Sequence, residues 1–441
     1  MSTYSVSPFT TAVVSSMRRL YPELLADQSF DNTGLLLEAP FISSRPRNRN
    51  TVLLTVDLTR AVAEEAIENK HSVVVAYHPI IFRSLKHITS NDPQQLSMTL
   101  LLAHGISVYC PHTAVDTVPG GMADWLCDVV TGKLEDPEPK AHNAEFVASE
   151  TEVTTSESNS EAPSKPSTRP TTPSAGGHNN DEDPFTTPRA KAKMKLARPD
   201  HTRRKYSKPG FPVPTDIFHP DVISHRRTVI SPSPEYLIDA ANQLTGSEKY
   251  TTSNTGAGRL IKFDKPQPLT LLITRIAHAI GLPKGFAVAI PQGANLEEVT
   301  VSSVATCPGS GGSIVRGTKA DLIFTGELSH HEALGVIERG GCVITLFHSN
   351  SERGYLWNIL RDRLEKEVEK DWKKVRGKES GKKGLSEEVK EMLKDESVEV
   401  VISERDRDPY GIVVLDETAV EGQKINGNAD GVAPSIEPPQ G

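Results

Sequence analysis

Three short apolar runs near the start of the chain, separated by segments of helical pattern, constrain the fold most strongly. The runs are TVLLTVDLT (51–59), HSVVVAYHP (71–79) and GISVYCPH (105–112). AVAEEAIENK (61–70) and a segment at roughly 93–104 lie between them and have helical character. Continuous apolar strands that alternate with helices are typical of βαβ units, in which helices cover both faces of a largely parallel sheet. The sequence therefore predicts an α/β fold.

The same alternation returns in the C-terminal part of the chain. VTVSSVATC (299–307), LIFT (322–325) and CVITLFH (342–348) have the pattern of buried strands, and helical patterns lie between the second and third of them and after the third. We therefore predict a two-lobed protein, with an N-terminal α/β lobe at 1–134 and a C-terminal α/β lobe at 235–416.

The segment between the two lobes has a different composition. It begins with a Ser-, Thr-, Pro- and Glu-rich stretch that has almost no large apolar residue, and it continues with the basic run RAKAKMKLARPDHTRRKYSK. Such a composition does not bury enough apolar surface to offset the entropy lost on ordering. We predict a disordered insert at 135–234 and a disordered tail at 417–441. The insert is a candidate docking segment for protein partners, although a solvated linker is the favoured interpretation of the basic run.

Charge and cysteine usage limit the classes of function. The net charge of −8 and the pI near 6.0 give no support to a nucleic-acid-binding surface. The cysteines Cys110, Cys127, Cys307 and Cys342 lie far apart and form no CxxC pair, which is typical of buried thiols in a reducing compartment. We therefore expect a cytoplasmic protein, with a nuclear address in the basic run as an alternative.

No apolar stretch reaches the roughly 18 residues that a membrane helix needs. The first 25 residues carry Arg18 and Arg19 and have no acid before Glu23, so a mitochondrial transit peptide is a further alternative. The apolar residues of this segment fall at helical spacing up to Pro22, which favours the first helix of the N-terminal lobe.

Metal-ligating residues follow three of the apolar strands, close to the point where each strand ends. His78 follows VVVA, Asp116 follows VYC by a few residues, and His348 follows VITLF, with Glu352 in the next turn. Because parallel strands bring their carboxyl ends to one edge of a sheet, where ligands bind, these four side chains are able to converge. Each alone is more simply explained as a cap or a surface residue, but four at strand ends favour a common site.

The residue types indicate which ion such a site would bind. Imidazole nitrogen together with carboxylate oxygen suits Zn²⁺, Mn²⁺ or Fe²⁺, and a structural thiolate site is not expected because no cysteine is near. A bridging carboxylate from Asp116 or Glu352 would allow two ions and hydrolysis by an activated water. We therefore predict His78, Asp116, His348 and Glu352 as metal ligands for one or two ions per subunit.

Other candidates lie close by in the sequence. His112, Glu327 and His331 follow strand ends and are candidates for proton transfer or for orienting the ligands. GSGGS (309–313) has neither Walker nor dinucleotide spacing, so a tight turn is favoured over a phosphate cradle. A serine hydrolase is not supported, since no nucleophile elbow is present.

These motifs together resemble the NIF-three-like family, whose members are also called GTP cyclohydrolase I type 2 homologues. The blocks that carry the resemblance run in family order across nearly all of the predicted ordered chain: FDNTGLLLE, AYHPIIFRSLKHIT, YCPHTAVDTVPGGMADWL, CPGSGGSI, TGELSHHEAL, LFHSNSERGYL and SERDRDP. The forms YHP and HSNSERG are similar to those of the eukaryotic branch. The resemblance implies a two-lobed α/β fold, a dinuclear metal site shared by both lobes, and a homo-hexamer.

The resemblance also implies site residues and a function. It assigns the metal ligands to His78, Asp116, His348 and Glu352, and it places His112 near the metals. Tyr77 stands where many bacterial relatives have a second histidine, so the second ion is expected to bind more weakly. The implied function is a metal-dependent hydrolase of a phosphoester or nucleotide-type substrate such as GTP. The alternative is a non-catalytic metal-binding regulator that acts through a partner such as a transcriptional adaptor.

Overall fold

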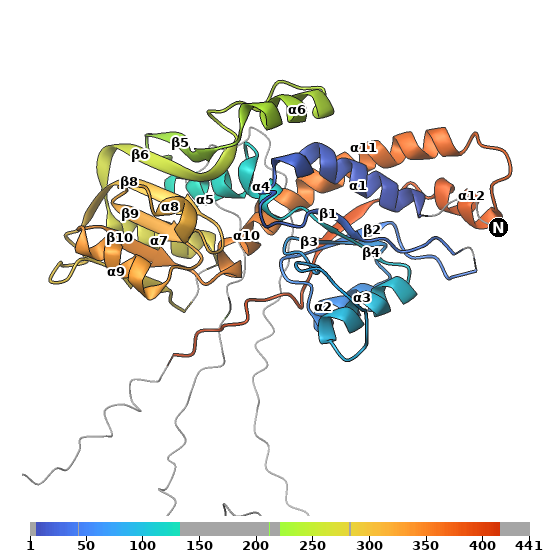
Figure 1. Ribbon diagram of the computed structural model, residues 1–441, viewed down its shortest axis with the longest axis horizontal. Coiled ribbons are helices and arrows are strands. Elements are labelled where there is room, and N and C mark those ends of the chain that lie inside the picture. Colours follow the sequence, from blue (N-terminus) through green and yellow to red (C-terminus); the bar gives the residue numbers. More distant parts are fainter. Residues whose placement is uncertain (1–5, 43, 133–210, 212–220, 282–283, 415–441) are drawn as a thin grey trace, which may run out of the picture. The chain divides into compact units, whose positions relative to one another are not determined.

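Two mixed sheets, each with helices on both faces, make up the computed structural model (Figure 1). The structure describes residues 6–42, 44–132, 211, 221–281 and 284–414, which belong to one compact unit. The predicted tail and most of the predicted insert lie outside these residues. Each helix in the described part of the chain is too short or too polar to span a lipid bilayer.

The first sheet has five strands, and its inner strands are parallel. Their order is β1 (Gly34–Leu37), β4 (Ser107–Cys110), β3 (Val73–Ala76), β2 (Thr51–Thr55) and β11 (Glu399–Ile402). Only β1 runs antiparallel to its neighbour. The three apolar runs of the N-terminal lobe form β2, β3 and β4, so the predicted βαβ units are confirmed.

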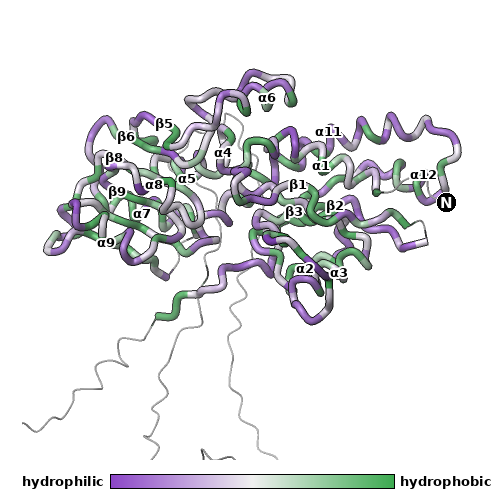
Figure 2. The backbone as a smooth tube through the Cα atoms, in the orientation of Figure 1, coloured by the Kyte–Doolittle hydropathy of each residue, from purple (hydrophilic) through white to green (hydrophobic). Residues whose placement is uncertain are grey.

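Successive strand residues point to opposite faces of this sheet. Both faces carry apolar side chains, and helices cover both. On one face Leu53 and Val74 pack against α2 (Arg60–Glu68) and α3 (Pro93–Ala103). On the other face Val52 and Val75 share a core with α1 (Pro8–Leu20) and α11 (Arg361–Glu379). Figure 2 shows hydrophobic residues concentrated on the strands and a mostly hydrophilic α11. The buried residues of this helix include Leu364, Val368 and Trp372, which recur every four residues and form a narrow apolar stripe.

The second sheet has six strands, and its parallel strands are again internal. Their order is β5 (His225–Pro232), β6 (Gly256–Pro268), β8 (Thr300–Cys307), β9 (Leu322–Thr325), β10 (Cys342–Thr345) and β7 (Ala287–Ala289). The strands β8, β9 and β10 are parallel, whereas β5, β6 and β7 pair antiparallel. The α/β class is confirmed, and the antiparallel pairings belong to outer strands of both sheets.

Helices also lie on both faces of the second sheet. Its core side chains pack against α5 and α7 on one face and against α8 and α9 on the other. The four helices that cover this sheet are α5 (Met122–Thr131), α7 (Leu269–Ala279), α8 (Gly312–Val315) and α9 (His330–Glu338). The remaining helices are α4 (Thr113–Thr117), α6 (Glu235–Thr245), α10 (Arg353–Tyr355) and α12 (Glu387–Lys394). They connect the layers or lie at their margins.

Two of the expected domain boundaries differ from the structure. Residues 225–232 form β5, although the range 135–234 was predicted as a disordered insert. The strand β11 lies in the predicted C-terminal lobe but pairs with β2 of the first sheet. Conversely, α5 lies in the predicted N-terminal lobe but packs against β6 and β8 of the second sheet. The lobes exchange elements, because long-range pairing decides where a strand or helix packs.

One glycine shows how closely the exchanged elements approach. A Cβ atom on Gly354 of α10 would lie 2.5 Å from Cζ2 of Trp125 on α5. Trp125 is 2% exposed, so its indole has little space into which it can move. The glycine therefore allows the chain that follows β10 to contact the helix beneath the second sheet.

We expect Gly354→Ala to lower the free energy of unfolding by about 1–3 kcal/mol, because the added methyl group overpacks a buried contact. Gly377→Ala in α11 is the matched control, since no atom lies within 4 Å of its added Cβ, and alanine is the better helix former. Urea unfolding of both variants measures the difference. A Gly354→Ala variant as stable as the control would contradict the tight contact.

Candidate metal centre

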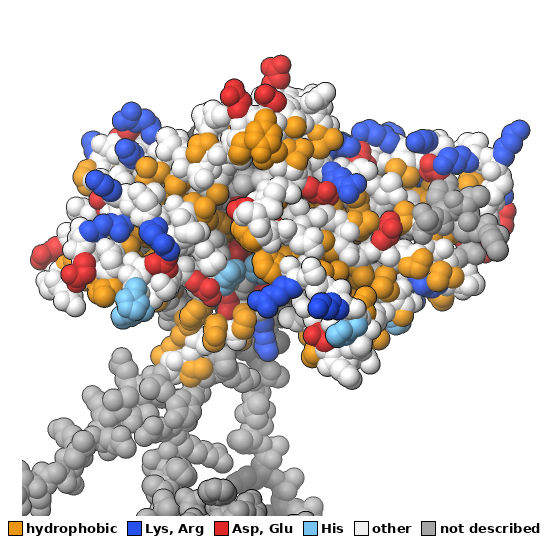
Figure 3. Space-filling view, in the orientation of Figure 1, with side chains coloured by type: hydrophobic (Ala, Val, Ile, Leu, Met, Phe, Trp, Pro, Cys, Tyr) orange, Lys and Arg blue, Asp and Glu red, His pale blue; other side chains and the backbone are white. Residues whose placement is uncertain are grey.

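The carboxyl ends of the parallel strands carry the polar residues of the candidate site. In the first sheet, β4, β3, β2 and β11 are neighbours in that order. The segments that follow them begin with Pro111-His112, Tyr77-His78, Val56-Asp57 and Ser403, respectively. In the second sheet, β10 is followed by the segment that contains His348. Figure 3 shows histidine and acidic side chains at the surface between the elements of the two sheets.

Three of the four predicted ligands come together at this edge. One potential ligand atom from each of His78, His348 and Glu352 lies within 4.8 Å of those of the other two. The distance from Glu352 Oε2 to His78 Nε2 is 3.3 Å, and that from Glu352 Oε1 to His348 Nε2 is 3.5 Å. Glu352 is 1% exposed, so its carboxylate lies between two imidazoles with almost no water around it.

Two further carboxylates orient the imidazole rings. His78 Nδ1 lies 2.8 Å from Asp57 Oδ1, and His348 Nδ1 lies 3.2 Å from Glu327 Oε2. A carboxylate only accepts hydrogen bonds, so each histidine donates from Nδ1 and turns Nε2 toward Glu352. Carboxylates that orient metal-binding histidines in this way are typical of metal sites.

The atoms that face one another lack partners. His78 Nε2 and Glu352 Oε2 are both buried, and neither makes a hydrogen bond. A buried polar atom without a partner costs about 1–3 kcal/mol. Either a proton on His78 Nε2 or a metal cation between these atoms would remove that cost. Imidazole nitrogen and carboxylate oxygen suit Zn²⁺, Mn²⁺ or Fe²⁺, so the residues present fit a divalent ion.

The backbone of Gly309 lies close to two of the candidate ligands. Gly309 has a φ of +58°, and a Cβ atom on it would lie 2.7 Å from Glu352 Oε1 and 2.9 Å from His348 Nε2. Its amide donates to Ser351 Oγ over 2.8 Å. The GSGGS segment is thus a tight turn that packs against the ligands, the interpretation favoured from its sequence. The residue before His348, Phe347, also has a left-handed φ of 67°, and such strain is typical of functional sites.

The segment after β11 ties the ligand-bearing loop to the first sheet. Asp406 accepts a hydrogen bond of 2.7 Å from Val56 N and forms an ion pair with Arg353. Asp408 accepts a hydrogen bond of 2.7 Å from Ser349 Oγ. Both aspartates therefore hold the 349–353 segment, which contains Glu352, in position relative to the strand ends of the first sheet.

The fourth predicted ligand, Asp116, lies beside the cluster but is directed to a different partner. Its Oδ1 accepts a hydrogen bond of 2.8 Å from the Tyr77 hydroxyl. Burial raises the pKa of Asp116 and the nearby charge of Glu352 raises it further, whereas the hydrogen bond from Tyr77 lowers it. Burial also raises the pKa of Tyr77, so the phenol is neutral at pH 7. The assignment of Asp116 as a ligand stays a prediction.

The other candidate site residues lie in two separate places. His112 lies next to the cluster, with its ring 5.6 Å from that of His78, and its Nδ1 is 2.6 Å from Asp31 Oδ1. Glu327 contacts His348, as described above. In contrast, His331 lines a separate cavity of about 490 Å³ on α9. Asp57 and Asp31 were not among the predicted site residues, although Asp57 shows the same strand-end signal as His78.

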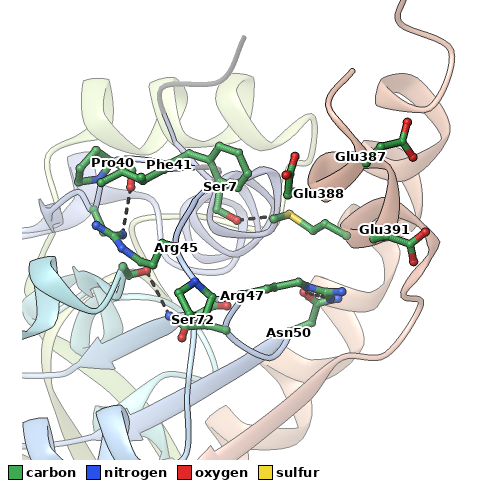
Figure 4. Close-up of a pocket in the computed structure, with 16 residues that line it drawn as sticks. Ser7, Pro40, Phe41, Arg45, Arg47, Asn50, Ser72, Glu387, Glu388 and Glu391 are labelled. Atoms are coloured by element: carbon green, nitrogen blue, oxygen red, sulfur yellow. Dashed lines mark hydrogen bonds between the residues drawn. The ribbon is translucent and has the colours of Figure 1, made fainter. Parts of the chain in front are cut away.

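Cavities near and far from the cluster differ in what lines them. A cavity of about 730 Å³ lies beside Asp57, with Arg405 and Arg407 in its wall. A cavity of about 400 Å³ lies at the amino ends of β2, β3 and β4, where Asn50, Ser72 and Gly105 line it (Figure 4). Among the described residues, only His78, His348 and Glu352 form a group of three or more side chains able to hold a metal ion. The carboxyl edge is therefore the candidate site.

Comparisons with known proteins agree with the sequence motifs. Residues 10–378 match the model of the family described as Duf34/NIF3 (NGG1p interacting factor 3). A "Protein NIF3 homolog" of Schizosaccharomyces pombe is 35% identical over 84% of this chain and 93% of its own length. The "NGG1-interacting factor 3" of Saccharomyces cerevisiae is 28% identical, over 91% of this chain and 96% of its own length. A solved Bacillus cereus protein related to NIF3 is 17% identical, with a TM-score of 0.49 over 91% of this chain and 98% of its own.

Metal binding is expected to release a proton. Burial alone lowers the pKa of His78, but the charge of Glu352 and the hydrogen bond to Asp57 raise it to about 10. At pH 7 the ion must displace this proton, so the affinity should rise with pH, by about tenfold per unit below pH 10. Calorimetry with Zn²⁺ in two buffers of different ionisation enthalpy measures the release. An affinity that does not change between pH 6 and pH 8 would contradict the assignment of His78 as a ligand.

The approach of Gly309 gives a second test. Gly309→Ala places a methyl group against two ligand atoms, and we expect the metal affinity to fall by at least about 10-fold. Gly246→Ala is the matched control, because its φ of +63° carries the same backbone strain and nothing lies within 4 Å of the added Cβ. Elemental analysis after dialysis against Zn²⁺ compares the two variants. Equal metal content would show that Gly309 does not lie against the ligands.

Proposed function

This chain belongs to the Duf34/NIF3 family, and from that premise we propose that it is a divalent-metal-dependent hydrolase acting on a phosphoester or nucleotide-type substrate. One observation carries the proposal. The buried atoms His78 Nε2 and Glu352 Oε2 face each other 3.3 Å apart without a hydrogen bond. The chemistry that a divalent ion supplies when bound between such groups is Lewis-acid activation of water and of the attacked bond.

The residues around the centre have separate roles in this proposal. Asp57 and Glu327 orient the two imidazoles through Nδ1. In this proposal His112 donates from Nδ1 to Asp31, so its Nε2 is the proton acceptor of a ring that lies 5.6 Å from the His78 ring. The hydrogen bond from His112 and those from Thr113 hold the pKa of Asp31 below its usual value against the effect of burial. His112 is thus placed to take a proton from the attacking water and to return it to the leaving group.

The wall of the cavity beside Asp57 contains both carboxylates and arginines, and Arg407 is the residue that supports an anionic substrate. Arg407 lines it, is exposed, and stacks over the ring of Phe211 at 5.0 Å. Arg405 on the same segment forms an ion pair with Glu68, whereas no ion pair of Arg407 is found among the described residues. A guanidinium without a carboxylate partner at the edge of a cavity suits a phosphate oxygen. A nucleotide such as GTP belongs to this class of substrate.

A second candidate function is a non-catalytic metal-binding regulator that acts through protein partners. The observation that favours it is the name of the Saccharomyces cerevisiae relative, which records an interaction with NGG1. In that case the metal centre would stabilise the contact between the two sheets and would turn over no substrate. The predicted homo-hexamer is compatible with both functions and stays a prediction.

An activity screen separates the two functions. The full-length protein is loaded with Mn²⁺, Zn²⁺ or Fe²⁺ and assayed against a panel of phosphomonoesters, phosphodiesters and nucleotides, alongside Glu352→Gln. We expect turnover by the wild type and a loss of at least about 100-fold in Glu352→Gln, because the substitution removes the charge that holds the ion. No turnover by a fully metal-loaded wild type, or equal activity in the variant, would reject the hydrolase.

Arg407→Gln tests the role of the cavity. We expect KM for a phosphoester substrate to rise about 10-fold with kcat nearly unchanged, because a charge-assisted hydrogen bond to the substrate is lost. Arg226→Gln, an equal change of charge at an exposed position of β5, is the control and should leave KM unchanged. Equal KM values for both variants would show that Arg407 does not contact the substrate.

A further inference from the structure

Two half-exposed phenyl rings lie beside the candidate metal centre, and the hydrolytic roles above do not use them. Phe30 is 52% exposed and Phe82 is 50% exposed. Their centroids are 6.3 Å apart, and their planes are tilted by 51°. Neighbouring apolar rings that face water are unfavourable in an isolated protein and often mark a binding site.

Hydrogen bonds hold the two phenyl rings in place. Asp31, next to Phe30, is hydrogen-bonded to His112 and to Thr113. Asn32 donates to the carbonyl oxygen of Ile81, the residue before Phe82. The loop before β1 and the loop after β3 are therefore fixed to each other and to the segment after β4.

A third ring links the phenyl pair to the metal centre. The His112 ring is edge-on to both phenyl rings, with centroids 6.4 Å from Phe30 and 6.5 Å from Phe82 and interplanar angles of 87° and 85°. On its other side it lies 5.6 Å from His78. A continuous row of rings thus leads from a candidate metal ligand to the phenyl pair. We call Phe30, Phe82 and His112 the aromatic platform.

We propose that the aromatic platform binds a planar aromatic ring of the substrate by stacking, while the group to be hydrolysed lies at the metal centre. The proposal rests on the proposed function and narrows its substrate class to molecules that carry both a planar ring and an anionic group. Rings of this kind stack on aromatic side chains through their π-faces. Phe30 and Phe82 are each about half exposed and so offer apolar surface to such a ring.

The strand order supports a substrate of this composition. His112 follows β4, His78 follows β3, Asp57 follows β2 and Arg407 follows β11, and these strands are neighbours in that order. The aromatic platform and the guanidinium therefore flank the metal ligands on opposite sides along the first sheet. An extended molecule with a ring at one end and anionic groups farther along matches that arrangement.

Calorimetry on the full-length Mn²⁺-loaded protein tests the aromatic platform. The probes are adenosine monophosphate and ribose 5-phosphate, which share the sugar phosphate and differ by the adenine ring. We expect the wild type to bind adenosine monophosphate at least about tenfold more tightly. Phe30→Leu and Phe82→Leu keep an apolar side chain but remove the π-face, so each should lose most of this preference and keep the affinity for ribose 5-phosphate. Tyr236→Leu on α6 changes a ring that is 70% exposed and should keep the preference.

Three results would overturn the proposal. The wild type could fail to bind adenosine monophosphate, or could bind it no more tightly than ribose 5-phosphate. The preference could survive both phenylalanine substitutions. Phe82→Leu could also change the oligomeric mass by light scattering while the preference remains, which would make the rings an interface between copies of the chain. Phosphate release is measured separately: turnover without ring preference rejects only the aromatic platform, and ring preference without turnover rejects only the hydrolase.

Discussion

The contact between His78 and Glu352 is the constraint on which the rest of the site depends. Their side chains come from segments that follow strands of different sheets, and they meet 3.3 Å apart without a hydrogen bond. Two buried polar atoms in this position need an opposite charge between them, supplied either by the proton that His78 holds at pH 7 or by a cation that displaces it. The protein must therefore hold the edges of two sheets at a fixed separation, and the side chains that meet there could hold a metal ion.

Several features away from the ligands serve this requirement. Asp406 and Asp408 join the ligand-bearing loop to the first sheet, and the exchange of β11 and α5 makes each lobe depend on the other. Gly309 and Gly354 have no side chain at two places where segments approach closely. The left-handed backbone of His112 and of Phe347 places strain next to the cluster, where the packing of both sheets maintains it. The separation between the sheet edges is thus set by many contacts rather than by the ligands alone.

Sequence periodicity predicted the parallel strands and the position of His78, His348 and Glu352, because both depend on short segments and on the rule that strand ends meet at one edge. It missed β6, whose pairing depends on the distant β5 and on β8. It did not predict that the Tyr77 hydroxyl donates a hydrogen bond to Asp116, whose assignment as a ligand stays a prediction. The direction of a side chain depends on neighbours from other segments, and spacing along the chain does not contain that information. Asp57 shows the opposite case, a strand-end signal that was present and not used.

Anomalous X-ray diffraction from crystals of the zinc-loaded protein would locate a bound ion relative to His78, His348 and Glu352. We predict a peak of zinc density bonded to His78 Nε2, His348 Nε2 and a carboxylate oxygen of Glu352, at about 2.0–2.2 Å from each. A second, weaker peak nearer Asp116 would agree with the predicted two-ion site. Zinc density only elsewhere on the molecule, or none in crystals soaked at saturating Zn²⁺, would contradict a metal centre formed between the two sheets.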